Sequence, residues 1–509
     1  MLSPHEFTTP VVRPLSSAPT AHPAAEDVQA EDFAALQDRM KTVDLQTRRG
    51  RPGRSLVVVP SRSPEPDEPP AKTHAYEERL LSVVQMLRDA ALSIVYVTSL
   101  PVAAAAVDYS LSLLPAHLRW SARHRLTMLS ADDASPRSLS AKLLARRDLL
   151  AEIRAALPDL ALAQLVPYET TDCERDLALA LGIPTYGAEP RHRHLGTKTG
   201  CRELFARLGV PHPLGVERIA GAGDAIAAIA ALRARRPEIA QVVVKLDESA
   251  AGRGNAIVEL GDLPAAGAPD ELVRIGERVA TMTLEAPGLT VGEYLNRLGE
   301  CGGIVEERIT GAEVRSPSVQ LNITPGGDVE VVSTHDQLLG GPNGQSYVGC
   351  RFPAEPQYAH QITELARRVG GELAHAGVMG NCAIDFVVAR NRRGTWRPYA
   401  IELNLRKGGT THPFMTASLI TGGACRHYLA SDHLPIEGLC GASAVTLLAD
   451  HGLSFDPTRG AGVVLHMLGA AVPLGRIGAT ALAPTATGAS ALYDRAAELL
   501  SKAARRVVA

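Results

Sequence analysis

The chain has 509 residues, which is too long for one ordinary hydrophobic core, so we expect two to four packed units. Its formal net charge of −3 is spread along the sequence without a basic block, and we therefore do not expect nucleic acid as a main partner. The seven cysteines are scattered and form no C-x-x-C pair, which favours reduced thiols in the cytoplasm over a zinc or redox motif of that type.

Residues 1–70 are rich in Pro, Ser, Ala and charge, with SRSPEPDEPP as the extreme case. No sustained helical or strand period is visible there, so we expect a disordered tail. The first thirty residues contain no continuous apolar segment, which argues against a secretory signal and for a cytoplasmic protein. The uncharged stretch 90–107 is long enough for a membrane span, but Thr98, Ser99 and Pro101 interrupt it, and we predict a buried strand and no membrane partner.

Residues 71–190 alternate between helical and β-branched patterns. The helical segment YEERLLSVVQMLRDA is followed by the apolar runs SIVYVTSL, RLTMLS and ALAQLV, with Ala- and Leu-rich helices between them. This alternation predicts a small α/β unit with a parallel sheet.

The composition becomes rich in Gly and Pro at GIPTYGAEP, and we place a domain boundary near residue 190. Further strands are predicted in QVVVKL, AIVEL and GIVEERI, and the turn TPGGD predicts a hairpin. After a helix in QYAHQITELARRVGGELAHAG, the runs NCAIDFVVAR and WRPYAIELNL predict a second hairpin around NRRG. The pattern over residues 426–509 predicts a small C-terminal domain.

The segment AIELNL carries the most informative polar residues. Strand alternation places Glu402 and Asn404 on one face, and Asp385 lies on the strand predicted to pair with theirs. Three oxygen donors at this point could bind one or two Mg²⁺ ions, which keep water and phosphate oxygens as their other ligands. The competing interpretation is that these are polar strand ends facing solvent.

Lys245 ends the run VVVKL, where its ammonium can either reach nucleotide phosphates or extend to water. Gly252 and Gly254 follow in DESAAGRGN and would let backbone N–H groups approach phosphate oxygens. A glycine-rich loop alone is weak evidence, and the sequence contains no G-x-x-x-x-G-K-[ST] motif, so a P-loop enzyme is disfavoured.

Three further segments could contribute to a nucleotide site. Backbone groups in GIVEERITGAEV could pair with adenine and Glu313 could accept from ribose, although an ordinary strand with surface acids would look the same. THDQLLGGPNGQSY has the composition of a functional loop, in which His335 is a base or only a hydrogen-bond partner. Arg406 and Lys407 in RKGGTTHP could stabilise a transferring phosphoryl group or an oxyanion, or form a solvated basic turn.

Taken in order, Lys198, Lys245, the glycine loop, VEERITGAE, Asp385 and the ELN triplet resemble the ATP-grasp superfamily. The wider text, including GTKTGCRELFARLGVPHP, THDQLLGGPNGQSYVGCRFPA and IELNLRKGGTTHPF, resembles the pheganomycin-type peptide ligases over about residues 76–500. The resemblance implies an α/β (α+β) protein with a parallel pre-ATP-grasp domain at 71–190 and an ATP-grasp domain at 191–425. The ATP-grasp lobes would be 191–300 and 301–425, followed by a small C-terminal domain at 426–509.

The resemblance also implies roles for individual residues. Lys198 and Lys245 would bind the phosphates of ATP. The backbone at Glu307 and Ile309, with Glu306 beside them, would bind adenine, and Glu313 would bind ribose. Asp385, Glu402 and Asn404 would bind Mg²⁺. One position departs from the pattern: many ATP-grasp ligases have Arg two residues before the first metal carboxylate, where this chain has Ala383. Either Arg406 or Arg315 would then supply the missing charge.

The implied reaction is ATP-dependent joining of a carboxylate to an amine through an acyl phosphate, giving ADP and phosphate. The small-molecule carboxylate would be an amino acid or a peptide, and a homodimer is common among similar ligases. Two alternatives keep the fold: a nucleotide-binding sensor or scaffold without catalysis, and a phosphotransferase that does not ligate.

Overall fold

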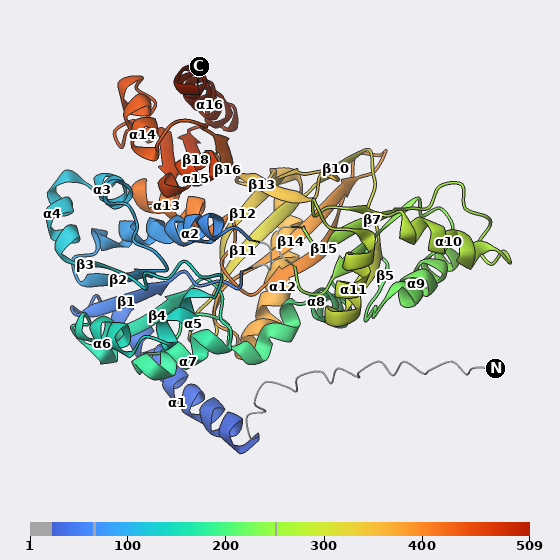
Figure 1. The fold of residues 1–509 in the computed structure, drawn as a ribbon, viewed down its shortest axis with the longest axis horizontal. Coiled ribbons are helices and arrows are strands. Elements are labelled where there is room, and N and C mark those ends of the chain that lie inside the picture. Colours follow the sequence, from blue (N-terminus) through green and yellow to red (C-terminus); the bar gives the residue numbers. More distant parts are fainter. Residues whose placement is uncertain (1–22, 65–67, 250–251, 509) are drawn as a thin grey trace, which may run out of the picture.

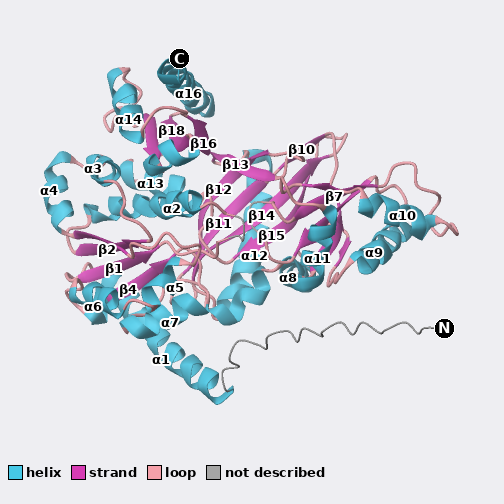
Figure 2. Cartoon of the chain, in the orientation of Figure 1, coloured by secondary structure: helices cyan, strands magenta, loops and turns pink. Residues whose placement is uncertain are grey.

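The computed structural model describes residues 23–64, 68–249 and 252–508, and the strands in these ranges form three sheets (Figure 1). A parallel four-stranded sheet lies at the left of Figure 1, a nine-stranded sheet occupies the centre and top, and a five-stranded sheet lies at the right. Figure 2 shows helices against all three sheets, which confirms the predicted mixture of α and β structure. Of the helices in the described ranges, none has the length and apolar character to cross a membrane.

The first unit is built on the strand order β3-β2-β1-β4, with every neighbouring pair parallel as predicted. Its elements are α1 (Pro23–Arg48), β1 (Arg54–Val59), α2 (Pro70–Arg79), η1 (Leu80–Arg88), β2 (Leu92–Thr98), α3 (Ala104–Ser112), α4 (Ala116–His124), β3 (Leu126–Ser130), α5 (Leu139–Leu144), α6 (Arg147–Ala155), η2 (Leu160–Leu162), β4 (Ala163–Pro167), α7 (Asp172–Leu181) and η3 (Pro190–Gly196).

The expectation of a disordered tail over 1–70 is wrong for residues 23–64, which contain α1 and β1; residues 1–22 lie outside the described ranges. β1 is an interior strand of the sheet, and Val57, Val58 and Val59 are completely buried. Burying a valine side chain stabilises a fold by about 1.5–3 kcal/mol. Burial of these three valines therefore stabilises β1 in the sheet, although the flanking segments are polar and rich in Pro. The strand has only six residues, so the polar, Pro-rich composition of the segments around it dominated the sequence pattern and the strand was not predicted. The uncharged stretch 90–107 contains the buried strand β2, as predicted.

The second unit has the strand order β5-β9-β6-β7-β8, in which all pairs are antiparallel. Its elements are α8 (Lys198–Arg207), β5 (Gly215–Val216), α9 (Ala222–Arg235), β6 (Gln241–Leu246), β7 (Asn255–Glu259), α10 (Glu271–Ala280), β8 (Thr283–Leu284), α11 (Val291–Cys301) and β9 (Gly303–Glu307).

The third unit is the nine-stranded sheet, in which both predicted hairpins are present as β11/β12 and β14/β15. Its elements are β10 (Glu313–Arg315), β11 (Pro317–Ile323), β12 (Val329–Gly340), β13 (Ser346–Phe352), α12 (Pro356–His375), β14 (Gly380–Arg390), β15 (Trp396–Asn404), α13 (Thr411–Ile420), β16 (His427–Pro435), α14 (Gly441–Asp450), β17 (Gly462–His466), η4 (Leu468–Ala470), α15 (Ala471–Leu474), β18 (Arg476–Ala483) and α16 (Ala486–Val508).

The C-terminal segment does not make a sheet of its own. β16 pairs with β13, and β18 and β17 continue the same sheet outward. One hydrophobic core joins Tyr96 of the parallel sheet and Leu87 of η1 to Ile477 of β18. The first unit and the end of the chain therefore pack together as one body. The loop that follows β15 contacts the first unit, where the backbone N–H of Lys407 donates to the Tyr168 carbonyl oxygen.

Candidate functional site

Asp385 and Glu402 lie directly opposite each other on β14 and β15, and Asn404 lies opposite Ala383 in the same register. The amide nitrogen of Asn404 donates to the Asp385 carboxylate over 3.2 Å. Strand alternation therefore brings the three oxygen-bearing side chains together, as the sequence predicted. The register shifts between Asp385 and Phe386, so a bulge interrupts the ladder beside this cluster, and the pairing then continues to Arg390.

The Asp385 carboxylate lies in a polar but partly buried position. Its other oxygen accepts a hydrogen bond from the Gln337 side chain of β12, at 2.8 Å. Burial and the neighbouring charge of Glu402 raise the pKa of Asp385 to about 6. Two carboxylates held this close favour either a shared proton or a bound cation.

Glu402 is bound by a lysine from another unit. Lys198 is the first residue of α8, whose N-cap Thr197 accepts from the backbone N–H of Gly200 at 2.9 Å. The Lys198 ammonium donates to Glu402 at 2.7 Å. Although burial opposes ionisation, the charges of Lys198, Arg406 and Lys245 hold the pKa of Glu402 below its usual value. Three cations therefore act on this one carboxylate.

Lys245 on β6 is buried, and its ammonium forms an ion pair with Glu306 of β9 at 2.5 Å. Glu306 also accepts from Arg202 of α8 at 2.8 Å. Glu306 is thus a buried counter-ion that orients Lys245, a more specific role than the general nucleotide contact expected of it. Arg202 was missed by the sequence reasoning, although its place one turn after Lys198 puts the two on the same face of a helix.

In the glycine loop between β6 and β7, residues 250–251 lie outside the described ranges, and residues 252–255 lie against the turn between β12 and β13. Gly252 has φ +81°, and a β-carbon on it would lie 2.3 Å from the Gln345 carbonyl oxygen. Asn255 donates to the Gln345 side chain at 2.6 Å. A β-carbon on Gly254 would in turn meet the Ser249 hydroxyl at 2.3 Å. Both glycines are therefore required by close packing in this conformation.

Arg406 and Lys407 follow β15 and line a cavity together with Tyr168 and Glu169, which come after β4. The Arg406 guanidinium lies 5.9 Å from the centre of the Tyr168 ring, and its charge acts on both Asp385 and Glu402. The Lys407 ammonium instead donates to the Pro167 carbonyl oxygen at 2.6 Å. Burial lowers the pKa of Lys407 to about 8.

The remaining predicted residues lie apart from the carboxylates. Glu313 pairs with Arg315 at 2.7 Å and with Arg390 at 2.8 Å, and Arg315 is opposite Val388 on β14. Val388 is three residues along the strand from Asp385, roughly 10 Å. Of the two arginines considered for the charge missing at Ala383, the structure therefore brings Arg406 to the cluster and not Arg315.

The predicted adenine contacts lie at the end of β9. The backbone N–H of Glu307 donates to the Leu214 carbonyl oxygen at 2.8 Å, so it is already paired within the sheet. Ile309 follows the strand in a partly buried position. The expected functional loop in THDQLLGGPNGQSY is mostly strand, because β12 extends to Gly340. Within it His335 is fully buried and bonds to the Tyr428 hydroxyl at 2.6 Å, which makes it a packing residue and not a base.

The donor set at the centre of the site fits magnesium. Asp385, Glu402 and Asn404 offer oxygens only, which is the ligand type that Mg²⁺ prefers, and the nearby cations fit phosphate oxygens. Gln337, which the sequence reasoning did not single out by itself, holds one carboxylate in place through its amide. The site is a meeting point of carboxylates and cations from all three units.

Sequence comparison places this chain among known proteins. The family described as IQCH-like ATP-grasp matches residues 270–424, and the family described as PGM1 C-terminal domain matches residues 443–496. The chain is 32% identical to L-propargylglycine–L-glutamate ligase of Streptantibioticus cattleyicolor over 449 residues, covering 83% of this chain and 88% of that protein. It is 27% identical to IQ motif-containing protein H of Danio rerio over 260 residues, covering 45% of this chain and 24% of that protein.

Solved structures share the fold at low sequence identity. Biotin carboxylase from Campylobacter jejuni superposes with a TM-score of 0.52 at 14% identity, covering 86% of this chain and 89% of the other. An ADP complex of N5-carboxyaminoimidazole ribonucleotide synthetase gives a TM-score of 0.51 at 11% identity, covering 88% and 97%. The arrangement of the three units is thus similar to that of two enzymes whose structures hold an adenine nucleotide.

Proposed function

Because this chain belongs to the ATP-grasp ligases, in the pheganomycin-type peptide ligase family, and is an ATP-dependent enzyme that forms C–N bonds, we propose that it joins the carboxylate of an amino acid or short peptide to an amine. One observation carries the proposal: Asp385 and Glu402 are surrounded by the charges of Lys198, Lys245 and Arg406. Such a cluster can hold a metal and a triphosphate together. A relative that covers most of the chain is named as a ligase of two amino acids, which supports this substrate class.

The reaction has two steps. An oxygen of the substrate carboxylate attacks the γ-phosphorus of ATP, ADP leaves, and an acyl phosphate is formed. The amine then attacks the acyl carbon, phosphate leaves, the amine gives up a proton, and the amide remains. Both steps depend on positioning and on charge stabilisation, so the enzyme needs no covalent nucleophile of its own.

The side chains divide this work between them. Lys198 and Lys245 exchange their carboxylate partners for phosphate oxygens when ATP binds, because both ammonium groups are already in the cluster. Arg406 stabilises the negative charge of the transferring phosphoryl group and of the oxyanion. Asp385, Glu402 and Asn404 hold Mg²⁺, which when bound neutralises charge on the β and γ phosphates. The glycine loop at Gly252 and Gly254 covers the phosphates, and the segment from Glu306 to Glu313 contacts the nucleoside.

The cavity beside Arg406 has a volume of about 10 Å³, room for about one water, and must open before it admits a substrate, but its charges match the ends of an amino acid. It is lined by Arg406 and Lys407 on one side and by Tyr168 and Glu169 on the other. A guanidinium and a carboxylate in one cavity match the carboxylate and the ammonium group of an amino acid substrate. We therefore place the amino acid substrates at this junction, next to the site of phosphoryl transfer. The cytoplasmic location and the homodimer both remain predictions. Gel filtration tests the homodimer.

Substrate identity and mechanism can be tested together. The protein is incubated with ATP, Mg²⁺ and pools of amino acids, and mass spectrometry detects the condensed product. A carboxylate substrate labelled with ¹⁸O should transfer one label to inorganic phosphate, with ADP formed in equal amount. A stable phosphorylated product without an amide would show a phosphotransferase instead. Nucleotide binding without ADP release in any pool would show a sensor or scaffold.

A further inference from the structure

A second cluster of ligand-type side chains lies outside the nucleotide site, where α13 meets the strands β16 and β17. It contains His412, Asp432 and His466, one ligand atom of each lying within 4.8 Å of the others. His412 and Asp432 are buried, and His466 is partly buried. The proposed ligation reaction uses none of these residues.

The imidazole of His412 has unsatisfied polar atoms. It is 2% exposed, and neither ring nitrogen has a hydrogen-bond partner among the described residues. Its Nε2 lies 3.5 Å from the nearest Asp432 oxygen, which is too long for a strong hydrogen bond. A neutral imidazole always carries one donor and one acceptor, and leaving both unpaired in a buried site costs about 1–3 kcal/mol each. A bound ligand at this nitrogen would remove part of that cost.

The carboxylate of Asp432 is divided between two kinds of partner. Its Oδ2 accepts from Arg79 of α2 at 2.6 Å, whereas its Oδ1 faces both imidazoles and lies 2.8 Å from His466 Nε2. The oxygen directed at the histidines is therefore not used by the arginine. Four ligands around zinc lie about 3.3 Å from one another at bond lengths near 2.0 Å, so the observed separations need only small shifts.

The fold leaves room for this arrangement. On β18, a β-carbon at Gly478 would lie 1.9 Å from His466 Nε2, so the imidazole occupies the space that any other residue would fill. The adjoining cavity is lined by His412, His466, Thr416, Thr480 and Glu78 and has a volume of about 30 Å³. A water molecule needs about 10–15 Å³ of such space, so the cavity accepts an ion with one or two waters but no amino acid or nucleotide.

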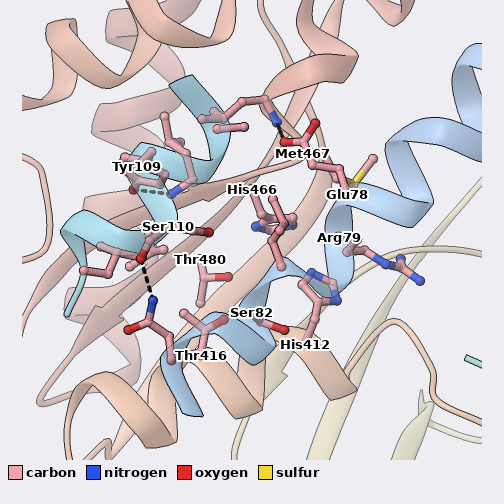
Figure 3. A pocket seen from close by; sticks show the side chains of 17 residues that line it. Glu78, Arg79, Ser82, Tyr109, Ser110, His412, Thr416, His466, Met467 and Thr480 are labelled. Atoms are coloured by element: carbon pink, nitrogen blue, oxygen red, sulfur yellow. Dashed lines mark hydrogen bonds between the residues drawn. The ribbon is translucent and has the colours of Figure 1, made fainter. Parts of the chain in front are cut away.

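Figure 3 shows the imidazoles of His412 and His466 next to each other on the wall of this cavity, with Arg79 and Glu78 to one side. Glu78 accepts from the backbone N–H of Gly469 at 2.8 Å. Glu78 and Asp432 supply two carboxylates against the single guanidinium of Arg79, so the surroundings tolerate an added cation.

We propose that His412, Asp432 and His466 form a binding site for a divalent transition metal ion of the zinc type, with water as the fourth ligand. Two imidazoles and one carboxylate suit zinc, while Mg²⁺ prefers oxygens alone. The ion would tie α13, which follows the loop carrying Arg406, to β16 and β17. On binding, the proton that His466 Nε2 shares with Asp432 moves to Nδ1 of the same ring. Since the cavity excludes organic substrates, the role of the ion is to fix α13 and the loop before it.

The test uses the full chain, first treated with a chelator and then saturated with Mg²⁺ and ADP to occupy the nucleotide site. Titration with Co²⁺ should give the intense visible absorption of a tetrahedral site at one equivalent, which Zn²⁺ abolishes by displacement. Zn²⁺ should also raise the melting temperature by a few degrees. The variant His466→Gln should weaken Co²⁺ binding by about 100-fold or more. The control is His433→Gln, which replaces an exposed histidine next to Asp432 on β16 and should bind Co²⁺ as the wild type does.

Two results would overturn the proposal: no tetrahedral Co²⁺ spectrum in the wild type, or one that His466→Gln leaves unchanged. If His466→Gln does not fold, X-ray absorption of the zinc-loaded wild type decides the question. Two imidazole ligands and no sulfur support the site, and fewer than two imidazoles, or any thiolate from the seven cysteines, reject it. The variant Glu402→Gln should keep the cobalt spectrum, because its carboxylate belongs to the separate nucleotide site.

Discussion

The Lys198 ammonium lies 2.7 Å from the Glu402 carboxylate, although 204 positions separate the two residues in the chain. One comes from the first turn of α8 and the other from near the end of β15. The contact fixes the helix of one unit against the sheet of another and places both charges at the nucleotide site. Under the proposed function, Lys198 would bind a phosphate oxygen and Glu402 would bind Mg²⁺, and in the absence of these ligands the two residues neutralise each other.

Replacing Glu402 by Gln should abolish ATP turnover while the fold survives. The amide keeps an oxygen that can accept from Lys198 but loses the charge that binds magnesium, which is expected to lower kcat by at least about 10²-fold. ADP release measures the effect, and a thermal melt verifies folding. Glu364→Gln on the exposed face of α12 is the control and should retain activity. Activity of Glu402→Gln close to that of the wild type would remove this residue from the metal site.

The charge missing at Ala383 can be assigned by comparing two arginines. Arg406→Gln should lower kcat by about 10²–10³-fold, because the guanidinium acts on both carboxylates and on developing negative charge. Arg315→Gln should change kcat less than about threefold, since its half-exposed side chain pairs with Glu313 away from the cluster. Steady-state kinetics with saturating ATP measures both variants. The opposite order of effects would transfer the role to Arg315.

Binding of Mg²⁺ should depend on pH through Asp385. Burial and the charge of Glu402 raise the pKa of this carboxyl to about 6, so it keeps its proton up to that pH in the metal-free protein. A proton must leave before a cation binds, so Mg²⁺ affinity should fall as the pH drops below about 6 and level off above it. The two carboxyls titrate as a pair, and the apparent pKa belongs to both. Calorimetric Mg²⁺ titrations from about pH 5 to about pH 8 measure this, and a flat profile would contradict the assignment.

Gly252 should be required for the loop to lie against its neighbouring turn. Gly252→Ala introduces a β-carbon 2.3 Å from the Gln345 carbonyl, in addition to the strain of a positive φ. We expect the KM for ATP to rise by about tenfold, equivalent to about 1.4 kcal/mol. Gly288→Ala is a matched control, because Gly288 has the same φ of +81° and open space around its β-carbon position. Equal effects of the two variants would show that strain alone, and not the contact with Gln345, is responsible.

Removing the charge of Glu306 should destabilise the protein itself. Glu306→Gln leaves Lys245 and Arg202 buried with one carboxylate fewer, and breaking a buried ion pair in this way costs about 3–5 kcal/mol. Glu217→Gln removes a partner of the same Arg202 at the same distance of 2.8 Å, but from a partly exposed position. Its cost should be below about 1.5 kcal/mol. Urea unfolding of both variants measures the difference, and equal losses would mean that burial does not distinguish the two carboxylates.

The sequence by itself determined the local pattern of this protein. The β-branched runs and hairpin turns predicted most strands, and alternation along AIELNL placed Glu402 and Asn404 on one face opposite Asp385. These predictions hold because strand period and turn geometry depend on neighbouring residues alone. The resemblance to a known family then supplied the reaction class.

Only the tertiary structure decided the partners of the charged residues. The sequence did not reveal that Glu306 orients Lys245, that Lys407 bonds to Pro167, or that His412, Asp432 and His466 come together from α13, β16 and β17. The sequence also did not predict β1. Its few buried valines form an interior strand because β2 and β4 pair with it on either side, and this pairing is visible only in the structure. Contacts between residues from about 20 to 240 positions apart depend on how whole units pack, and no local period or composition encodes them.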